Sequence, residues 1–135
     1  MLTKFDDIKK SEPETDDLEG WVVVQGKPTM RTQVLHTNNE KNMISGIWEA
    51  TPGTYHATYS AYEFVHIISG KIKITPDDGT GPKIVSSGDT FIVESNFKGT
   101  WEIQEKVLKH FDFMLNIRYL MLTINLSSSL SCAPN

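Results

Sequence analysis

The chain has 135 residues, of which 39% are hydrophobic and 10% aromatic, enough to bury the core of one domain. The net charge is −4 and no cluster of Lys and Arg follows a face, which argues against nucleic-acid binding. A lone cysteine, Cys132, excludes an internal disulfide. The N-terminus lacks the apolar core of a signal peptide, and the apolar run 119–124 is too short to cross a bilayer. We therefore expect a cytoplasmic protein without a membrane partner.

The first 19 residues differ in charge from the rest of the chain. They hold seven acidic residues against three lysines, which is −4, whereas the acids and bases of the remaining residues cancel. Little apolar periodicity accompanies them, and Pro13 interrupts the segment. We expect residues 1–19 to form an acidic, flexible leader. An arm that contacts a partner protein is the functional alternative.

From Trp21 onwards, short β-rich runs alternate with Gly, Pro, Asn and Asp turn signals. The strands expected from these runs are 21–25, 32–37, 43–50, 54–59, 63–69, 71–75, 83–85, 90–94, 99–104 and 107–114. Many short strands without a long helical period predict an all-β sandwich or barrel over residues 20–114.

The last segment, 115–135, has an atypical composition. No acidic residue follows Asp112 and no charged residue follows Arg118, and the chain then becomes rich in serine. One more strand and a disordered tail are the two expectations for this segment. An altered reading frame is a third explanation of its composition.

Segment 52–70 carries the main chemical signal. It is expected to place His56 and Glu63 on neighbouring strands and to close a hairpin at Ser69-Gly70. Side chains alternate between the two faces of a strand, so His56 is expected to share the barrel-lining face of its strand with Thr58. If Glu63 points inward, His66 points outward as a packing or interface residue.

Imidazole and carboxylate are both ordinary ligands of divalent transition ions, so His56 and Glu63 are candidate metal ligands. The alternative is a His–Glu hydrogen bond lining a metal-free barrel. In an enzyme, either side chain would be the catalytic acid or base. Nearby aromatic residues could line a pocket for a small polar ligand, although aromatics in small barrels usually fill the core. The candidate ligand-binding residues are Trp48, Tyr55, Tyr59 and Trp101. Lys109 and His110 could supply a cation near the barrel mouth, and the alternative for both is a solvated position on the surface.

Several of these motifs resemble a known family. The spacing Glu63-x6-Gly70, the preceding Pro52-Gly53, and Gly88-Asp89 followed by 91–93 resemble the two barrel motifs of cupins. Residues 46–53 and 98–102 resemble more narrowly the cupins related to ureidoglycine aminohydrolase and to ethanolamine utilisation protein Q. The resemblance covers about residues 21–112. It implies an all-β fold, the cupin double-stranded β-helix or jelly-roll barrel, which is commonly a homodimer.

In metal-binding cupins, a His-x-His pair, a Glu and a later His converge on one ion. The resemblance places His56 at the first His and Glu63 at the Glu, with Thr58 and Gly99 at the second and third His positions. It therefore implies a degraded metal site.

Three functions remain open at this stage. The first is a small stand-alone cupin that binds a small polar molecule. The second is a metal-dependent (Mn, Zn, Fe or Ni) aminohydrolase-like enzyme, and the third is a non-catalytic interaction module. No cofactor is firmly implied, and the one candidate is a divalent transition metal. Whether the protein is an enzyme stays open.

Overall fold

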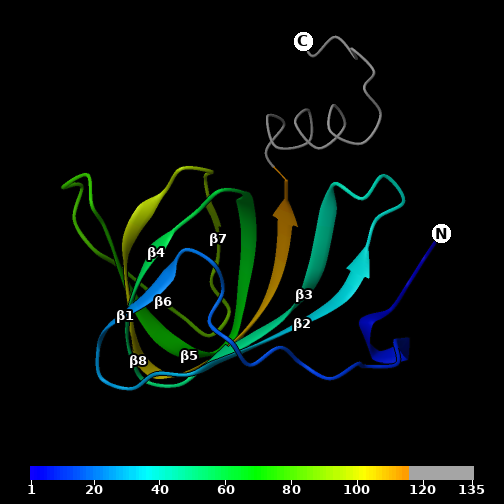
Figure 1. Ribbon diagram of the computed structural model, residues 1–135, viewed down its shortest axis with the longest axis horizontal. Helices are drawn as coiled ribbons and strands as arrows, with labels where there is room; N and C mark the ends of the chain where they lie inside the picture. The colour runs from blue at the N-terminus through cyan, green and yellow to red at the C-terminus, as the bar shows by residue number, and fades with distance from the viewer. Residues whose placement is uncertain (116–135) are drawn as a thin grey trace, which may run out of the picture.

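The computed structural model describes residues 1–115, and the regular structure in this part of the chain is mostly β-strand (Figure 1). The elements are η1 (Phe5–Asp7), β1 (Trp21–Gln25), β2 (Met30–Thr37), β3 (Met43–Ala50), β4 (Gly53–Thr58), β5 (Tyr62–Pro76), β6 (Lys83–Ser86), β7 (Thr90–Val93) and β8 (Lys98–Met114). All strand pairs in this part of the chain are antiparallel. The fold is therefore all-β, as the sequence predicts.

The two long strands, β5 and β8, pair along most of their length and join two layers. In one layer the strand order is β2–β3–β8–β5–β7, which uses the C-terminal part of β8 and the N-terminal part of β5. In the other layer the order is β1–β4–β8–β5–β6, which uses the opposite parts of the same two strands. Figure 1 shows the resulting curled sheet. This arrangement confirms the jelly-roll expectation.

The hairpin expected at Ser69-Gly70 is wrong, because β5 continues through this point. The pairing of β5 with β8 shifts register between Ile67 and Ile72, which marks a bulged bend. Gly70 has φ +100°, and a Cβ there would lie 2.3 Å from the carbonyl oxygen of Lys106. The glycine therefore permits a bend between the two layers rather than a turn. Likewise, the separate strands expected over 99–104 and 107–114 form the single strand β8.

The core lies between the two layers and is unusually rich in aromatic rings. On each long strand, alternate residues are buried, as expected for side chains that alternate between faces. The largest fully buried side chains include Trp48, Trp101 and Tyr55. Fully burying a large apolar side chain contributes about 1.5–3 kcal/mol before the entropy cost. Packing of these rings therefore contributes substantially to the stability of the barrel.

The acidic leader contacts the barrel at several points. Phe5 lies edge-on against His110, with ring centroids 5.4 Å apart. Glu14 and Thr32 of β2 exchange two backbone hydrogen bonds of 2.8 Å. The phenol of Tyr55 donates a hydrogen bond to Asp17 at 3.0 Å. Figure 1 shows the leader running along the barrel to β1. Its flexibility stays a prediction.

Two further expectations from the sequence concern the C-terminal segment and membrane-spanning helices. The expectations for segment 115–135 fall almost entirely outside the described residues. Across residues 1–115 there is no helix long and apolar enough to span a membrane.

Candidate functional site

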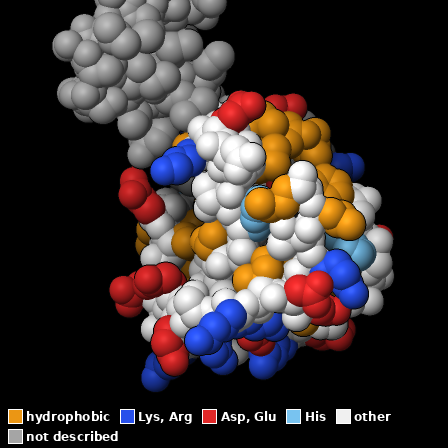
Figure 2. Space-filling view, turned by 90° about the vertical axis from the view of Figure 1, so that its right-hand side faces the viewer, with side chains coloured by type: hydrophobic (Ala, Val, Ile, Leu, Met, Phe, Trp, Pro, Cys, Tyr) orange, Lys and Arg blue, Asp and Glu red, His pale blue; other side chains and the backbone are white. Residues whose placement is uncertain are grey.

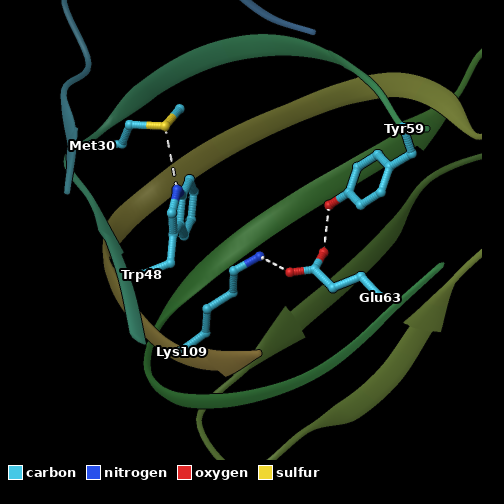
Figure 3. A network of polar contacts seen from close by, with 5 residues as sticks. All are labelled: Met30, Trp48, Tyr59, Glu63 and Lys109. Carbon is cyan, nitrogen blue, oxygen red and sulfur yellow. Dashed lines mark hydrogen bonds and ion pairs between the residues drawn. The ribbon is translucent and has the colours of Figure 1, made fainter. Parts of the chain in front are cut away.

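A buried ion pair occupies the inside of the barrel (Figure 3). The Lys109 ammonium donates to Glu63 Oε2 at 2.7 Å, and the two residues are 2% and 0% exposed. Tyr59 donates its phenolic proton to Glu63 Oε1 at 2.7 Å. Each carboxylate oxygen thus accepts one charge-assisted or phenolic hydrogen bond. A buried charge is tolerated only when it is paired and hydrogen-bonded in this way.

Strand alternation explains how the sequence places these two charges inside. On β5 the buried face carries Glu63, Val65 and Ile67. On β8 the buried face carries Val107, Lys109 and Phe111. Each apolar stripe therefore contains one charged residue, of opposite sign to that of the other stripe. Lys109 lies opposite Ile67 in register, so its long side chain extends along the sheet to reach Glu63.

Two tryptophan faces complete the surroundings of the ammonium group. Trp48 lies opposite Lys109 in the β3–β8 register, and the Lys109 Nζ atom is 4.6 Å from its ring centroid. The same atom is 5.0 Å from the ring centroid of Trp101. Cations are attracted to aromatic faces at such distances, most strongly when water is excluded. Trp48 is itself oriented by a hydrogen bond from its Nε1 to Met30 Sδ at 3.3 Å (Figure 3).

Burial dominates the pKa values in this cluster. It raises the pKa of Tyr59 well above its usual value, and the nearby charge of Glu63 adds to the shift. It lowers the pKa of Lys109, while the attraction of Glu63 opposes that change. Burial also raises the pKa of Tyr55, helped by its hydrogen bond to Asp17. Both phenols are therefore neutral donors at ordinary pH.

The structure buries all four aromatic residues proposed from sequence as ligand-binding. Trp48, Tyr55, Tyr59 and Trp101 are each at most 4% exposed and belong to one core cluster. Sequence reasoning missed the ring of Trp21, which lies 5.0–5.9 Å from the rings of these four residues, centroid to centroid. Trp21 is the first residue of β1 and belongs to the same core cluster. Ligand binding by these rings stays a prediction.

His56 does not lie on the inner face with Glu63, contrary to the sequence expectation. Its neighbours Tyr55 and Ala57 are fully buried, so alternation turns His56 outward. The ring Nε2 of His56 lies 2.8 Å from Asp77 Oδ2, in the connection that follows β5. Moreover, β4 pairs with β1 and β8, whereas Glu63 lies on β5. The expectation of neighbouring strands that place His56 and Glu63 together inside the barrel is therefore wrong.

An apolar groove of about 630 Å³ opens over the inner side of β6 and β7. Its hydrophobic lining consists largely of residues that belong to the core or pack against it: Ile74, Val85, Phe91, Val93 and Phe97. Val93 lies opposite Glu63 in the β5–β7 register. Phe91 and Phe97 contact the rings of Trp101 and Tyr59, with centroids 6.1 and 5.7 Å apart. Glu63 and Lys109 do not line the groove themselves, but residues that line it pack against the aromatic rings around the pair.

A family model described as an EutQ-like cupin domain matches residues 37–111, more than half of the chain. The chain belongs to the EutQ-like cupin family. No curated protein sequence matches this EutQ-like cupin.

Solved structures agree with this assignment at the level of fold. The EutQ protein of Clostridium difficile has a TM-score of 0.59 and 19% identity, covering 66% of this chain and 70% of its own. A putative ethanolamine utilisation protein Q from Salmonella typhimurium has a TM-score of 0.58 and 13% identity, covering 79% and 96%. A DUF861-family protein of unknown function from Pseudomonas syringae has a TM-score of 0.63 and 20% identity. This match covers 79% of the present chain and 44% of the Pseudomonas syringae chain. At these identities the likeness shows the fold alone.

The residues of this EutQ-like cupin do not fit the metal ion bound by other cupins. Such ions take three or more N, O or S ligands, and residues 1–115 contain no converging group of three His, Cys, Asp or Glu residues. All four histidines of the chain are partly exposed, and Figure 2 shows histidine side chains reaching the surface on one face. Glu63 instead binds an ammonium group.

The two positions at which metal-binding cupins have histidines, Thr58 and Gly99 in this chain, also argue against a metal site. Thr58 is exposed at the end of β4. A Cβ on Gly99 would lie 2.6 Å from the ring of Phe97 and 2.7 Å from the carbonyl oxygen of Thr75, so no histidine fits there without rearrangement. Both the residue types at these positions and the packing around Gly99 therefore differ from those expected of a metal site.

Proposed function

We propose that this EutQ-like cupin binds a small molecule in the groove over β6 and β7, next to the Glu63–Lys109 centre and without a metal ion. The observation that carries the proposal is the groove itself. Its volume falls within the range of about 300–1,000 Å³ typical of small-molecule sites. Its lining is mainly apolar, and a few polar groups stand at its rim and beneath it, which is also typical of such sites.

The Glu63–Lys109 pair near the groove supports the binding of a small molecule better than it supports the binding of a metal ion. Tyr59 and Trp101, two of the residues proposed from sequence, form the aromatic layer between the groove and the ion pair. Glu63 and Lys109 hold each other in place behind this layer, which supports a rigid wall for the groove. At the rim lie Asp78, Lys83 and Glu94. The homodimer implied by the family stays a prediction.

A pair of neighbouring substitutions tests the location of binding. Val85 lines the groove, whereas Ile84 is 56% exposed and lies outside the lining. A thermal-shift screen of small amines, carboxylates and amides should yield hits with the unmodified protein. Val85→Trp should weaken the binding of those hits at least about tenfold, because the indole projects into the groove and takes up space that a ligand needs. Ile84→Trp should leave binding unchanged. Equal binding by both variants would place the ligand elsewhere and contradict the proposal.

A further inference from the structure

The groove runs along a strand edge that has no neighbouring strand. Three consecutive residues of β7 line it, Phe91, Ile92 and Val93. Successive side chains of a strand point to opposite faces, so a groove that touches all three borders the edge of the strand. Within residues 1–115, β7 pairs with β5 alone. The β5 residues of that pairing, 63–66, do not line the groove, so the groove lies along the free edge of β7.

The sheet register shows which backbone groups this free edge presents. Ile67 of β5 donates its backbone N–H to the carbonyl oxygen of Asp89 at 2.9 Å, so its backbone groups point toward β7. Alternate residues of an antiparallel strand point their backbone groups the same way, so Val65 also bonds toward β7, where its partner is Phe91. The next residue of β7, Ile92, therefore points both its N–H and its C=O away from β5. Outside the strand pairing, no backbone hydrogen bond within residues 1–115 involves Ile92.

Nothing in the sequence of β7 protects this edge. Exposed strand edges are usually blocked by Lys, Pro or a bulge, or are covered by another segment. The edge strand β2 is covered in this way at Thr32, whose backbone bonds to Glu14 of the leader. By contrast, β7 has the sequence Thr-Phe-Ile-Val, and the Ile92 side chain is 49% exposed. An open edge beside an apolar groove is an arrangement that binds extended peptides by adding them as a strand.

The charges that line the groove favour one direction for such a strand. The connection 87–89 joins β6 to β7 and bounds one end of the groove. Lys83 begins β6 and Glu94 follows β7, so both lie at the opposite end. With Asp78, they give the groove lining one net negative charge. A chain antiparallel to β7 has its amino terminus beside Glu94, where a positive α-ammonium group complements that charge.

We propose that the groove binds the amino-terminal residues of a short, free peptide, extended antiparallel to β7 and paired with Ile92. The proposal rests on the function proposed above and names the ligand class of that same site. The second peptide residue lies opposite Ile92 and exchanges two hydrogen bonds with it. The first and third residues lie opposite Val93 and Phe91, so their side chains point into the apolar groove. Because β7 has four residues and ends at the 87–89 connection, the bound peptide is short.

The tripeptide Val-Thr-Val, with a free amino terminus and an amidated carboxyl terminus, is the probe. Titrated into the full chain, it should bind with a dissociation constant on the order of 0.1 mM and move the Ile92 amide signal downfield in ¹H–¹⁵N NMR. Methylating the threonine nitrogen removes the donor to the Ile92 carbonyl and should weaken binding at least about tenfold. Acetylating the amino terminus removes the positive charge and should weaken binding about three- to tenfold.

Two variants of one residue separate the backbone from the side chain. Ile92→Pro removes the N–H that the peptide needs, on an edge where proline is tolerated because that N–H makes no bond to β5. It should weaken the tripeptide at least about tenfold. Ile92→Ala keeps the N–H and should bind within about threefold of the unmodified protein. If Ile92→Pro does not fold, the N-methylated peptide tests the same pairing on the unmodified protein.

Equal binding of the methylated and unmethylated peptides would overturn the proposal, because strand pairing would then contribute nothing. Failure of the tripeptide to bind at about 10 mM would overturn it as well. In either case, screen hits that Val85→Trp weakens and Ile84→Trp does not would leave the groove standing as a small-molecule site. Hits that both variants bind equally would contradict the proposed function itself.

Discussion

Replacing Lys109 by Met is expected to lower the free energy of unfolding by about 3–5 kcal/mol. The substitution leaves the Glu63 carboxylate fully buried with only the Tyr59 phenol as a partner. An uncompensated buried charge costs far more than the small net gain of an ordinary hydrogen bond. Urea denaturation followed by circular dichroism measures the change.

Two further variants show whether the charge is the cause. In the double variant Glu63→Leu/Lys109→Met, both charges are gone, so most of the lost stability should return. Lys106→Met removes an ion pair with Glu49 at 3.7 Å in which the lysine side chain is 66% exposed, and it should cost at most about 1 kcal/mol. A cost below about 1 kcal/mol for Lys109→Met would mean that water reaches the pair, contrary to the burial described above.

Replacing Trp21 by Ala is expected to cost about 3–5 kcal/mol, the range for large aromatic residues removed from a core. The Trp21 side chain is 7% exposed and its ring contacts four other aromatic rings. Its loss would open a cavity in the aromatic core. Urea denaturation measures the cost, and fluorescence quenching by acrylamide should show the remaining tryptophans becoming more accessible.

The adjacent residue provides a matched control for Trp21. Val22 lies on the same strand but is 61% exposed, so Val22→Ala should change the stability by no more than about 0.5 kcal/mol. Similar costs for the two variants would indicate that β1 contributes through its backbone pairing with β4 rather than through the Trp21 ring.

The fold was predictable because local signals agreed with one another. Turn residues separated the β-rich runs, and the spacing between Glu63 and Gly70 resembled a barrel motif. The role of Gly70 was not predictable from local signals. A glycine after a serine looks alike in a hairpin and in a bulge, and only the close approach of the Lys106 carbonyl distinguishes the two.

The candidate site was predicted only in part, since alternation fixes relative faces and leaves the absolute direction open. Tyr55 and His56 are neighbours on one strand, so a regular strand cannot turn both inward. The fully buried Tyr55 and Ala57 determine which residue faces out. Lys109 could have been found from sequence, because it lies at an alternate position within the apolar stripe Val107 to Phe111. Its pairing with Glu63 required the register of β5 with β8.

Metal content is the measurement that tests the central claim most directly, namely that the Glu63–Lys109 pair replaces a metal centre. The protein and its Glu63→Gln variant are purified without chelator and analysed for Mn, Fe, Ni and Zn by plasma mass spectrometry. The charge and donor set at Glu63 predict far less than one metal ion per chain, with no difference between the two proteins. One equivalent of a transition metal that is lost in Glu63→Gln would contradict the claim.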